Sequence, residues 1–439
     1  MIWSKYNYLF VSKKFGNLLF NSLSNSFAEL DDETYHELLE IKKNTETYDF
    51  DTVPELYSQL LKKKIIIQEK DDDYNYLKYE TSIQRFNNSF LALTIAPTRH
   101  CNFSCEYCYE QDRPSIYMTD KTEEALIDFI KAHTGINRLF IDWYGGEPLL
   151  AFDRIKSITN KILELDIEYQ ASIITNAYLL DKTIIEQLPD LKINEIQITL
   201  DGLEETHNKR RPHIENNDSY KTILHNIDDL VKFDKEGKIL KNIRMNVDAT
   251  NSHEYKELYK LLNEQHGQGK LMMHPGFVDD ITGCRSSGGC LFDKNQVADF
   301  ITDQYENHKI KDLGFYPPGH QGECMARSNN SYLVGPEGDL YKCWNDIGND
   351  KYSIGNIHAL DKIKNSMLRK YMIGADPLDD PRCNKCFYFP MCSGGCPWKR
   401  LRNKYDGLEF DLCTYFKVNL DTFLEIHYEI KKDKVNIGL

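Results

Sequence analysis

Three closely spaced cysteines are the residues of this sequence best suited to chemistry. Cys101, Cys105 and Cys108 stand as C-x3-C-x2-C in the segment RHCNFSCEYCYE. Three thiolates on one short loop can bind three irons of a [4Fe–4S] cube, which leaves the fourth iron open to another molecule. Zinc sites usually contain two separate C-x2-C pairs, so the spacing favours a cluster, with zinc or unligated thiols as the alternative.

Tyr107 stands directly before the last of these cysteines, and the whole pattern resembles the signature of the radical S-adenosylmethionine (radical SAM) enzymes. The resemblance implies that SAM binds the open iron through its amino and carboxylate groups. It also implies reductive cleavage of SAM to methionine and a 5′-deoxyadenosyl radical, which abstracts hydrogen from an unactivated position. The cofactors would carry this chemistry, while the protein positions the substrate and excludes water. The Tyr107 ring could pack against adenine.

Further motifs of this family follow the predicted strands. The segment IDWYGGEP resembles the GGEP motif, whose backbone and glutamate hold the amino group of SAM, and glycines let the backbone approach a ligand closely. Other positions match residues that contact the ribose, the carboxylate and the nucleoside of SAM in relatives. The SAM-binding residues implied by the resemblance are Tyr107, Gly145, Gly146, Glu147, Pro148, Thr175, Asn176, Thr199, Asp201, Arg210 and Asn246.

The assignment of Arg210 to the SAM carboxylate has alternatives. An arginine suits this role because its guanidinium can bind both carboxylate oxygens. Arg211 or Arg244 could serve instead, and a solvated surface arginine is an equally good explanation for any one of them. The strand-end residues, taken singly, are also explained by capping and turn chemistry.

Seven more cysteines lie in the C-terminal third, and their arrangement resembles the SPASM domain, which carries auxiliary iron–sulfur clusters in enzymes that modify peptides and proteins. The resemblance implies three [4Fe–4S] clusters in all. It assigns four cysteines to the second auxiliary cluster and three to the first, with zinc on the paired thiolates as the alternative. The set of four is Cys383, Cys386, Cys392 and Cys413, and the set of three is Cys324, Cys343 and Cys396.

Three thiolates leave the first auxiliary cluster one ligand short of a closed cube. Cys284 and Cys290, in the segment TGCRSSGGCLF, have no other assignment. We hypothesise that one of them completes this cluster. The alternative is an open iron that could bind a substrate thiolate.

A catalytic base could be needed to remove a proton when a second electron leaves the substrate. Asp346, which follows Cys343 closely, is the candidate. A solvent-exposed turn aspartate is the alternative explanation of this residue. His274, after a predicted strand, is a second candidate base.

The composition limits the classes of partner and location. The 439 residues predict two to four domains. With 54 Lys and Arg against 68 Asp and Glu, the formal charge is −14, which disfavours nucleic acid. The sequence contains neither a signal peptide nor an apolar run of the roughly 20 residues that span a membrane, so we expect a cytoplasmic protein. Thiols stay reduced there, so the 12 cysteines favour cluster ligation over disulfides.

Residues 1–80 are predicted to form a small separate domain. Three β-rich runs, YNYLFV, GNLLFNS and NSFAEL, precede two helical stretches, DDETYHELLEIKK and VPELYSQLLKKK, and a strand at IIIQ. This order is typical of a winged-helix domain, but residues 1–90 contain 11 Lys or Arg against 15 Asp or Glu, so a peptide is a better ligand than DNA. The domain resembles the recognition elements that bind leader peptides as an added strand, with a purely structural domain as the alternative. The segment EKDDDYNYLKYE is expected to be an acidic connector.

From Phe90 the pattern alternates between strands and helices. Strands are predicted at FLALTI, RLFIDW, ASIIT, EIQITL, IRMNV and around KLMMHPGFV. Helices are predicted near residues 120–133, 152–164, 181–188, 219–233, 253–264 and 293–308. Successive βα units predict a parallel sheet, with reactive groups at the C-terminal ends of its strands in a barrel. A flat doubly wound sheet has the same local pattern, and the motifs favour the barrel.

The expected fold is therefore α/β. A partial (β/α)6 barrel of the radical SAM type covers residues 88–310, after an N-terminal winged-helix-like α+β domain and before a cysteine-rich SPASM domain at residues 311–439.

This combination of domains resembles maturases of ribosomally made peptides. We expect a radical SAM oxidoreductase that installs a C–C, C–O or thioether crosslink on a precursor peptide with a leader sequence, supplied with electrons by a flavodoxin or ferredoxin. One alternative is oxidation of a Cys or Ser side chain in a protein, as in sulfatase maturation. Others are a non-catalytic iron–sulfur or peptide-binding protein and a radical SAM enzyme that acts on a small molecule.

Overall fold

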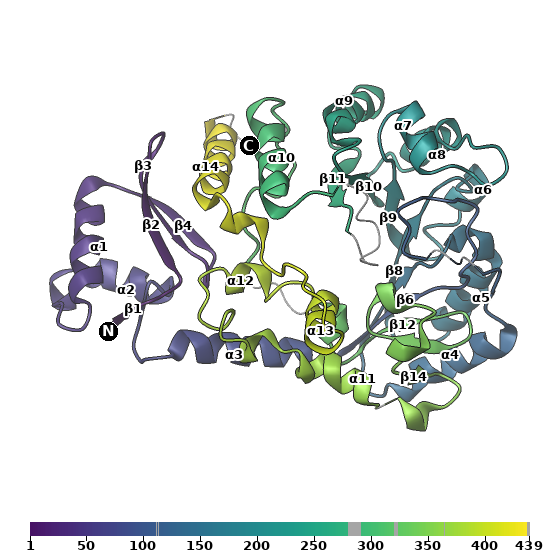
Figure 1. Cartoon of the computed structure of the whole chain (residues 1–439), viewed down its shortest axis with the longest axis horizontal. Coiled ribbons are helices and arrows are strands. Elements are labelled where there is room, and N and C mark those ends of the chain that lie inside the picture. Colours follow the sequence, from purple (N-terminus) through teal and green to yellow (C-terminus); the bar gives the residue numbers. More distant parts are fainter. Residues whose placement is uncertain (111, 113, 280–290, 320–323, 364, 437–439) are drawn as a thin grey trace. The chain divides into compact units, whose positions relative to one another are not determined.

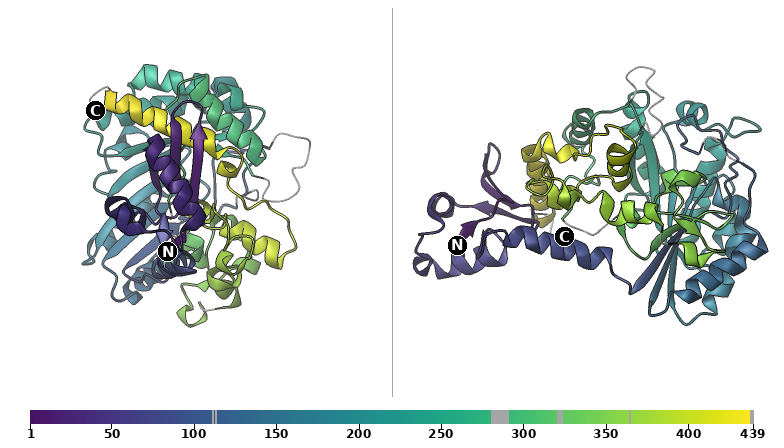
Figure 2. Two further views of the ribbon diagram at one scale, coloured as in Figure 1. Left: turned by 90° about the vertical axis from the view of Figure 1, so that its left-hand side faces the viewer. Right: turned by 60° about the horizontal axis from the view of Figure 1, so that its bottom comes forward.

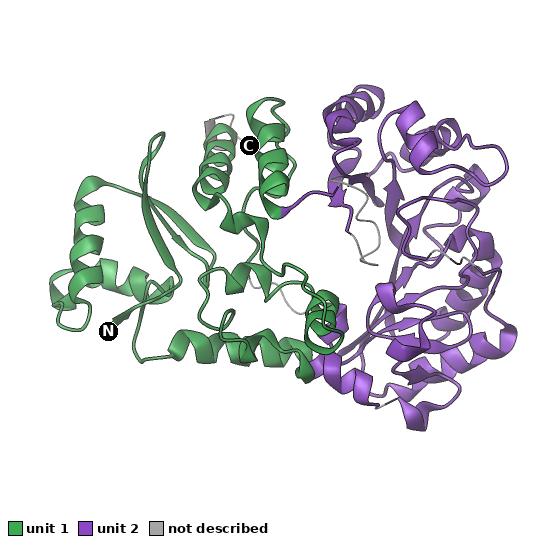
Figure 3. Ribbon diagram, viewed as in Figure 1, with its two compact units in different colours: residues 1–86, 294–324, 373–439 green, residues 87–293, 325–372 purple. Residues whose placement is uncertain are grey.

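The computed structural model describes residues 1–439 except 111, 113, 280–290, 320–323, 364 and 437–439. The chain divides into two compact units (Figure 3). Unit 1 comprises residues 1–86, 294–324 and 373–439, and unit 2 comprises residues 87–293 and 325–372. Within the described part of the chain, no helix is both long and apolar enough to cross a membrane.

Unit 2 is built on a nine-stranded sheet with the order β11-β10-β9-β8-β7-β6-β12-β13-β14. Its strands β6 to β11 are parallel and follow one another in sequence order (Figure 1), which confirms the predicted succession of βα units. Because the strands are parallel, their C-terminal ends lie along one edge, where the predicted motifs begin. The six strands are β6 (Phe90–Ile95), β7 (Arg138–Trp143), β8 (Glu168–Thr175), β9 (Ile193–Thr199), β10 (Leu240–Val247) and β11 (Met272–Phe277).

Helices cover one face of this sheet (Figures 1 and 2). Each of the longer ones buries a single apolar face; α5, for example, buries Ile155, Ile158 and Ile162 at helical spacing. The helices are α4 (Asp120–Ala132), α5 (Phe152–Leu163), α6 (Lys182–Ile185), α7 (Glu204–Arg210), α8 (Tyr220–Phe233) and α9 (Tyr255–His266). The sequence analysis missed α7 because its seven residues are polar and only His207 is buried, so no apolar period marks it.

Residues 325–372 extend the same sheet on the other side of β6, which the sequence analysis did not predict. Strand β12 (Ser331–Val334) pairs in parallel with β6, and β13 (Asp339–Tyr341) and β14 (Gly355–Asn356) follow in antiparallel order. All four residues of β12 are buried. Cys343 therefore directly follows a strand of the sheet that contains the predicted SAM site. Helix α11 (Ser366–Arg369) lies further along this segment.

The N-terminal part of unit 1 is rich in β-structure. Strands β2 (Asn7–Ser12), β3 (Gly16–Asn21) and β4 (Ser26–Leu30) form an antiparallel sheet in which β4 is an edge strand. Helices α1 (Asp32–Asn44) and α2 (Pro54–Lys62) follow, and β1 (Ile2–Trp3) pairs with β5 (Ile66–Ile67). The Asp31 side chain caps α1 by accepting a hydrogen bond from Thr34 N. A small core holds these elements together: Leu19, Leu38, Ile41, Leu60, Ile65 and Ile66.

The expected acidic connector is instead a helix, α3 (Asp72–Arg85). Leu77, Thr81 and Arg85 recur every four residues and are buried, a narrow stripe that the many polar neighbours conceal in the sequence. Arg85 forms an ion pair with Asp376, both in unit 1. The prediction of a connector was therefore wrong because α3 is held by tertiary contacts rather than by a broad apolar face.

The remaining helices of unit 1 are α10 (Lys294–Glu306), α12 (Phe389–Cys392), α13 (Pro397–Tyr405) and α14 (Leu420–Asn436). Helix α14 contacts the N-terminal sheet through polar and aromatic side chains. Ser12 Oγ donates to Glu425, Tyr8 bonds Asp421, and Phe27 lies against Tyr428. One face of the sheet is thereby covered within unit 1.

Candidate active site

The segment from Cys101 to Cys108, here called the cluster loop, follows β6 and is anchored by backbone hydrogen bonds. Ser104 N donates to Pro212 O over 3.0 Å, and Ile214 N donates to Asn102 O over 3.0 Å. Within the loop, Phe103 N donates to the Cys101 sulfur over 3.4 Å. The loop that carries the three predicted iron ligands is therefore fixed against the chain after α7.

The three thiols of the cluster loop match the donor set of a [4Fe–4S] cube, which takes one thiolate per iron and can leave one iron open. Among the described residues, no group of three His, Cys, Asp or Glu side chains is arranged to hold one metal ion. Burial raises the pKa of the Cys101 thiol, and the nearby Glu147 carboxylate raises it further.

Gly145 and Gly146, which follow β7, have no side chains and therefore lie close to the backbone just before the cluster loop. A Cβ on Gly146 would lie 2.2 Å from the carbonyl oxygen of His100, and one on Gly145 would lie 2.3 Å from that of Thr98. Glu147 N donates to His100 O over 2.9 Å. The sequence analysis expected close approach to a ligand, and the structure adds that these glycines allow two loops of the site to pack backbone to backbone.

The Glu147 carboxylate joins the ends of β7 and β8. It accepts hydrogen bonds from Thr175 Oγ1 over 2.6 Å, from Asn176 N over 2.8 Å and from Leu149 N over 3.1 Å. Burial raises the pKa of this carboxyl, although the three hydrogen bonds oppose the shift. Pro148 begins the short turn that follows, in a position where its missing N–H costs nothing.

Asn176 connects this group to the cluster loop, because its side-chain amide donates to Asn102 Oδ1 over 2.8 Å. Both side chains are buried. Asn102, between two predicted iron ligands, was missed by the sequence analysis because nothing in its local sequence indicates a partner 74 residues away. Thr199, at the end of β9, is also buried.

Tyr107 is the centre of a second group of predicted residues. Its hydroxyl accepts hydrogen bonds from Asn246 Nδ2 over 3.0 Å and from the Arg211 guanidinium. Asn246 N in turn donates to Asp201 Oδ1 over 3.0 Å. Burial raises the pKa of the Tyr107 hydroxyl well above its ordinary value. Three residues expected to contact SAM are thus brought together, and Arg211 joins them.

Arg210 is held by acidic and polar partners at the edge of this group. Its guanidinium donates to Asp248 Oδ2 over 2.8 Å and to Thr250 Oγ1 over 3.0 Å, and Asp201 lies 3.7 Å away. Burial opposes ionisation of Asp248, but bonds from Thr250 and Arg210 outweigh it and lower the carboxyl pKa. With only 13% of its side chain exposed, Arg210 is not a solvated surface residue.

Arg244 and His274 occupy paired positions on β10 and β11. Arg244 Nε donates to Asn246 Oδ1 over 2.9 Å, and a Cβ on Gly276 would lie 2.4 Å from that nitrogen. Gly276 therefore makes room for the guanidinium. Burial lowers the pKa of His274, and the positive charge of Arg244 lowers it further, which favours a neutral imidazole able to accept a proton.

Two tyrosines and a tryptophan form an aromatic group beside the cluster loop that the sequence analysis did not single out. The hydroxyls of Tyr109 and Tyr144 share a hydrogen bond. The ring of Tyr144 stacks on Trp344, with centroids 5.8 Å apart. Burial raises the pKa of both tyrosines. In the sequence, these three residues are marked only by their neighbours, since Tyr109 follows Cys108, Tyr144 precedes Gly145 and Trp344 follows Cys343.

Asp346 lies in the 3-10 turn Trp344–Asp346 and is fully buried. Tyr371 Oη donates to its Oδ2 over 2.5 Å. The alternative of a solvent-exposed turn aspartate is therefore wrong, because the turn packs its carboxylate against the segment around Tyr371. Its role as a catalytic base stays a prediction.

Four of the seven C-terminal cysteines line one cavity in unit 1, which we call the four-cysteine pocket. The cavity has a volume of about 390 Å³. Its cysteines are Cys383, Cys386, Cys392 and Cys413. Burial raises the pKa of the Cys392 thiol to about 11, and the neighbouring thiols add to this shift. These are the four residues that the resemblance assigns to one closed cluster, and their number fits it.

A turn of left-handed residues shapes this pocket. Ser393, Gly394 and Gly395 have φ angles of 46°, 77° and 79°. A Cβ on Gly395 would lie 2.3 Å from the carbonyl oxygen of Leu412, directly before Cys413. The glycines therefore let the chain after Cys392 fold back against the segment that carries the fourth cysteine.

The cysteines expected at the first auxiliary cluster are distributed along the chain. Cys324 and Cys396 belong to unit 1 and are exposed, whereas Cys343 follows β13 in unit 2. Cys284 and Cys290 lie outside the described residues. The ligand set of this cluster stays a prediction.

Residues 95–262 match the radical SAM superfamily, so this part of the chain is a radical SAM domain. Members of that superfamily bind SAM and a [4Fe–4S] cluster. The chain is also similar in sequence to anaerobic sulfatase-maturating enzymes. The serine-type anaerobic sulfatase-maturating enzyme of Bacteroides thetaiotaomicron is 24% identical over 352 residues, which cover 70% of this chain and 82% of that protein. The uncharacterized protein MJ0907 of Methanocaldococcus jannaschii is 34% identical over 114 residues, 26% of this chain and 39% of that protein.

Two solved structures have a similar fold. Native anSMEcpe with bound AdoMet and Cp18Cys peptide superposes with a TM-score of 0.62 at 20% identity, covering 80% of this chain and all of that one. Streptococcus suis SuiB bound to the precursor peptide SuiA gives a TM-score of 0.51 at 17% identity, covering 94% of this chain and 99% of that one. These similarities confirm the predicted fold.

Proposed function

We propose that this enzyme installs a C–C, C–O or thioether crosslink on a ribosomally made precursor peptide, and that the leader of this peptide binds to the N-terminal sheet. The observation that carries the proposal is a groove beside strand β4. A peptide substrate needs an extended binding surface, and an open sheet edge next to an apolar groove provides one.

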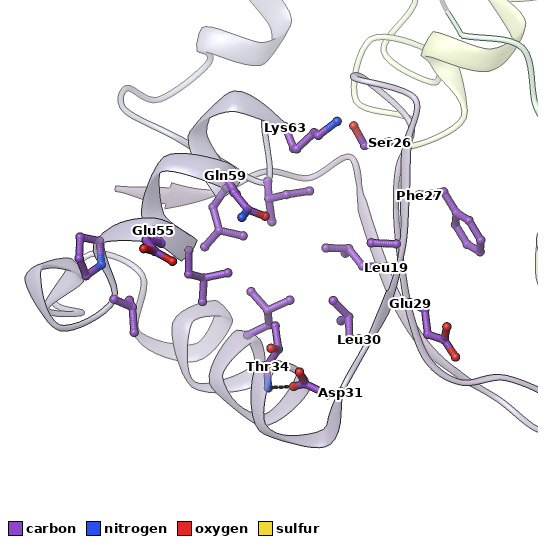
Figure 4. A pocket seen from close by; sticks show the side chains of 17 residues that line it. Leu19, Ser26, Phe27, Glu29, Leu30, Asp31, Thr34, Glu55, Gln59 and Lys63 are labelled. Carbon is purple, nitrogen blue, oxygen red and sulfur yellow. Dashed lines mark hydrogen bonds between the residues drawn. The ribbon is translucent and has the colours of Figure 1, made fainter.

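The groove lies between β4 and helices α1 and α2 and has a volume of about 720 Å³. Figure 4 shows Leu19 and Leu30 on the side of the helices, whereas Phe27 and Glu29 lie on the other side of the sheet. The floor is the apolar core of this part of unit 1. Its leucines are Leu19, Leu30, Leu38, Leu56 and Leu60.

Strand β4 can accept a further strand because it is the edge of its sheet. Its residues alternate in direction: Phe27 and Glu29 contact α14, so Ser26, Ala28 and Leu30 face the groove. A peptide added to this edge would place every second side chain among the leucines. Glu55 and Asp31 lie at the rim of the groove. We therefore expect a leader with two apolar residues at alternate positions, flanked by a basic residue.

The residues of the radical SAM domain would hold the cofactors. Cys101, Cys105 and Cys108 would bind the cluster, and the Tyr107 ring would pack against adenine. The GGEP backbone and Glu147 would bind the amino group of SAM. The remaining contacts to SAM would come from the strand-end residues Thr175, Asn176, Thr199, Asp201, Arg210 and Asn246. When bound, the cluster and SAM together supply a 5′-deoxyadenosyl radical that removes hydrogen from the peptide.

Asp346 is the proposed base for the proton that leaves the substrate. Its buried carboxylate is held by Tyr371, so its position is defined before a substrate binds. Asp346→Asn keeps the shape and the hydrogen bond, and we expect it to lose peptide product while it still cleaves SAM. His274 would be the base instead if Asp346→Asn forms product at the normal rate.

The four-cysteine pocket would hold the second auxiliary cluster, and Cys324, Cys343 and Cys396 the first. Such clusters could accept the second electron from the substrate, and a flavodoxin or ferredoxin would supply the reducing electron for SAM. Replacing Cys284 and Cys290 together with alanine tests whether one of them completes the first auxiliary cluster. A full iron content and unchanged cluster spectra would contradict that role.

Oxidation of a Cys or Ser side chain in a protein is a second candidate function. The observation that favours it is the sequence similarity to serine-type and cysteine-type anaerobic sulfatase-maturating enzymes, at 24% and 23% identity. The two candidates share the SAM site and differ in the use of the groove. A crosslinking enzyme with a leader needs the groove, whereas a side-chain oxidase that recognises only the target segment does not.

The experiment compares two substitutions on the same sheet. Ala28→Lys places a long charged side chain at the groove, whereas Val11→Lys changes a residue on β2 that is 62% exposed and does not line the groove. The substrate to test is any short peptide whose open reading frame neighbours that of this chain, and mass spectrometry follows both the peptide and 5′-deoxyadenosine. We expect Ala28→Lys alone to lose peptide modification, with SAM cleavage unchanged. Equal modification by both variants would contradict the leader site, and modification of a leaderless Cys or Ser peptide would support the second candidate.

A further inference from the structure

Arg400, in helix α13, lies against the four-cysteine pocket and is almost fully buried, with 6% of its surface exposed. Its Nη2 lies 3.0 Å from the sulfur of Cys383. The same nitrogen donates to Gly394 O over 2.7 Å, and Nε donates to that oxygen over 3.1 Å. A buried positive charge therefore stands in hydrogen-bond contact with one of the four thiols.

Asp380 holds this guanidinium in place through Nη1, whereas Cys383 lies at Nη2. Its Oδ2 accepts a hydrogen bond from Arg400 Nη1 over 2.8 Å. The same carboxylate binds Arg382, whose side chain is 81% exposed. Two of the contacts depend on backbone geometry, because Gly394 is left-handed and a Cβ there would lie 2.2 Å from Pro377. The direction in which Arg400 points is thus fixed by three partners.

We propose that Arg400 is a positioning residue that raises the reduction potential of the cluster in the four-cysteine pocket, and that Asp380 sets the size of this effect. The inference rests on the proposed cluster ligands Cys383, Cys386, Cys392 and Cys413. It concerns how readily this cluster accepts an electron, which the ligand assignment alone does not determine.

The direction of the effect follows from charge. A reduced cluster with its thiolates carries one more negative charge than the oxidised one, so a nearby cation and an N–H···S hydrogen bond stabilise the reduced form more. Hydrogen bonds to the sulfurs and net charge are among the known determinants of such potentials. Burial strengthens the interaction because little water screens it. The Asp380 carboxylate opposes the effect by neutralising part of the Arg400 charge.

Arg402 provides a comparison on the same helix. It is as buried as Arg400, at 4% exposed, but it pairs with Asp406 over 3.1 Å and lies over the ring of Trp398. It is not among the residues that line the pocket. Loss of a buried arginine from α13 can therefore be separated from loss of the charge beside Cys383.

The test is a potentiometric titration of the reconstituted full-length protein, followed by electron paramagnetic resonance with dithionite as the one-electron donor. Alanine replaces five cysteines in all samples, so that neither the cluster of the cluster loop nor the first auxiliary cluster gives a signal: Cys101, Cys105, Cys108, Cys324 and Cys343. Each addition transfers one electron and forms or breaks no covalent bond.

We expect Arg400→Gln to lower the potential so that the ratio of reduced to oxidised cluster falls at least tenfold at a fixed potential, which equals about 59 mV. Asp380→Asn is expected to shift the potential in the opposite direction, because it keeps the shape and unmasks the charge. Arg382→Gln and Arg402→Gln are the controls and should give shifts much smaller than that of Arg400→Gln. Opposite signs for Arg400→Gln and Asp380→Asn would not arise from loosened packing.

An unchanged potential in Arg400→Gln, with full iron content, would overturn the proposal. If Arg400→Gln fails to bind the cluster, Asp380→Asn decides the question alone, and no upward shift would overturn it. Failure of the ligand assignment gives a different result: replacing Cys383 and Cys386 together with alanine would leave the iron content and the spectrum unchanged.

Discussion

The cluster loop of unit 2 and the four-cysteine pocket of unit 1 present their thiols in different surroundings. The loop offers three cysteines within eight residues, next to polar groups that are hydrogen-bonded to one another, such as Tyr107 and Asn246. The pocket gathers four cysteines from a segment of 31 residues around one cavity and adds a buried arginine. Under the proposed assignments, the first arrangement would leave a ligand position open, and the second would close a cluster and adjust its charge.

Both sites nevertheless contain glycines that allow two backbone segments to lie close together. Gly145 and Gly146 clear backbone carbonyls beside the cluster loop, and Gly395 clears the carbonyl of Leu412 beside the pocket. In both cases a side chain would separate two backbone segments that carry or support the cysteines. The close approach of backbones is therefore a requirement of both cysteine sites, whether the cluster is open or closed.

The largest expected effect separates the two sites by function. Cys105→Ala removes one proposed ligand of the open cluster and should reduce 5′-deoxyadenosine formation to background. Cys386→Ala removes one proposed ligand of the closed cluster and should leave SAM cleavage measurable, while crosslinked peptide is lost. Both products are measured in the same anaerobic assay by liquid chromatography and mass spectrometry. If Cys386→Ala also abolished SAM cleavage, the division into a reactive and an electron-accepting site would be wrong.

The next largest effect concerns the close-packed glycine at each site. Gly146→Ala and Gly395→Ala each force a Cβ to within 2.2–2.3 Å of a carbonyl oxygen, so each should cost about 1–3 kcal/mol or more in overpacking. Gly395→Ala adds the strain of its φ of 79°, roughly 1–2 kcal/mol. We therefore expect Gly395→Ala to lower the thermal unfolding midpoint more than Gly146→Ala does.

Gly237→Ala is the matched control for the backbone strain alone. Its φ is 70° and nothing lies within 4 Å of the added Cβ. It should therefore lower the midpoint less than Gly395→Ala does. Equal losses in the two variants would mean that the carbonyl of Leu412 moves aside easily and that close packing at the pocket matters little.

At both sites the sequence predicted some features and not others. The cysteines and the strand ends could be predicted because both follow local patterns. The cysteines are closely spaced, and the strands β6 to β11 alternate with helices along the chain. The side-chain contacts that hold these residues in place could not be predicted from the sequence. Tyr107 meets Asn246 at a separation of 139 residues, and Arg400 meets Cys383 through a turn whose left-handed residues only the structure reveals.

The elements that the sequence analysis missed have the same physical cause. Helix α3 buries a stripe of Leu77, Thr81 and Arg85 with an ion pair to Asp376, and two of these three buried side chains are polar, so no apolar period signals the helix. Strand β12 has four residues and becomes buried only through its pairing with β6. Both elements are stabilised by distant partners, which the local sequence pattern does not reveal.

A smaller effect tests the polar surroundings of the open site. Tyr107→Phe removes the hydroxyl that accepts from Arg211 and Asn246, which leaves the buried Arg211 and the half-buried Asn246 without that acceptor, at a cost of about 1–3 kcal/mol. We expect SAM affinity, measured by equilibrium dialysis, to fall by about tenfold. Tyr109→Phe is the control, since it removes only the bond to Tyr144 and should change the affinity less. Equal affinities of the two variants would mean that the hydrogen bonds to the Tyr107 hydroxyl do not help to shape the SAM site.

The smallest expected effect is an acid dependence that both sites should share. Hydrogen bonds from Arg382 and Arg400 hold the Asp380 carboxyl pKa well below its ordinary value of 3.8, against the effect of burial. Burial likewise opposes ionisation of Asp248, but Thr250 and Arg210 lower its pKa. A lowered pKa means that the unfolded chain binds more protons in acid. The stability from each carboxylate is therefore complete above about pH 4 and is lost as the pH falls through the folded-state pKa.

Asp380→Asn and Asp248→Asn test this at each site, with urea unfolding of the purified chain at pH 7 and pH 3. At pH 7 each variant should be less stable than the parent by no more than about 2 kcal/mol, because Arg382 is exposed and its pairing is screened. At pH 3 the difference should shrink, since the same carboxyl takes up a proton in the unfolded parent and thereby stabilises the unfolded chain. A difference that stays constant with pH at Asp380 but shrinks at Asp248 would mean that the pocket holds its carboxylate by shape and that only the SAM site depends on charge.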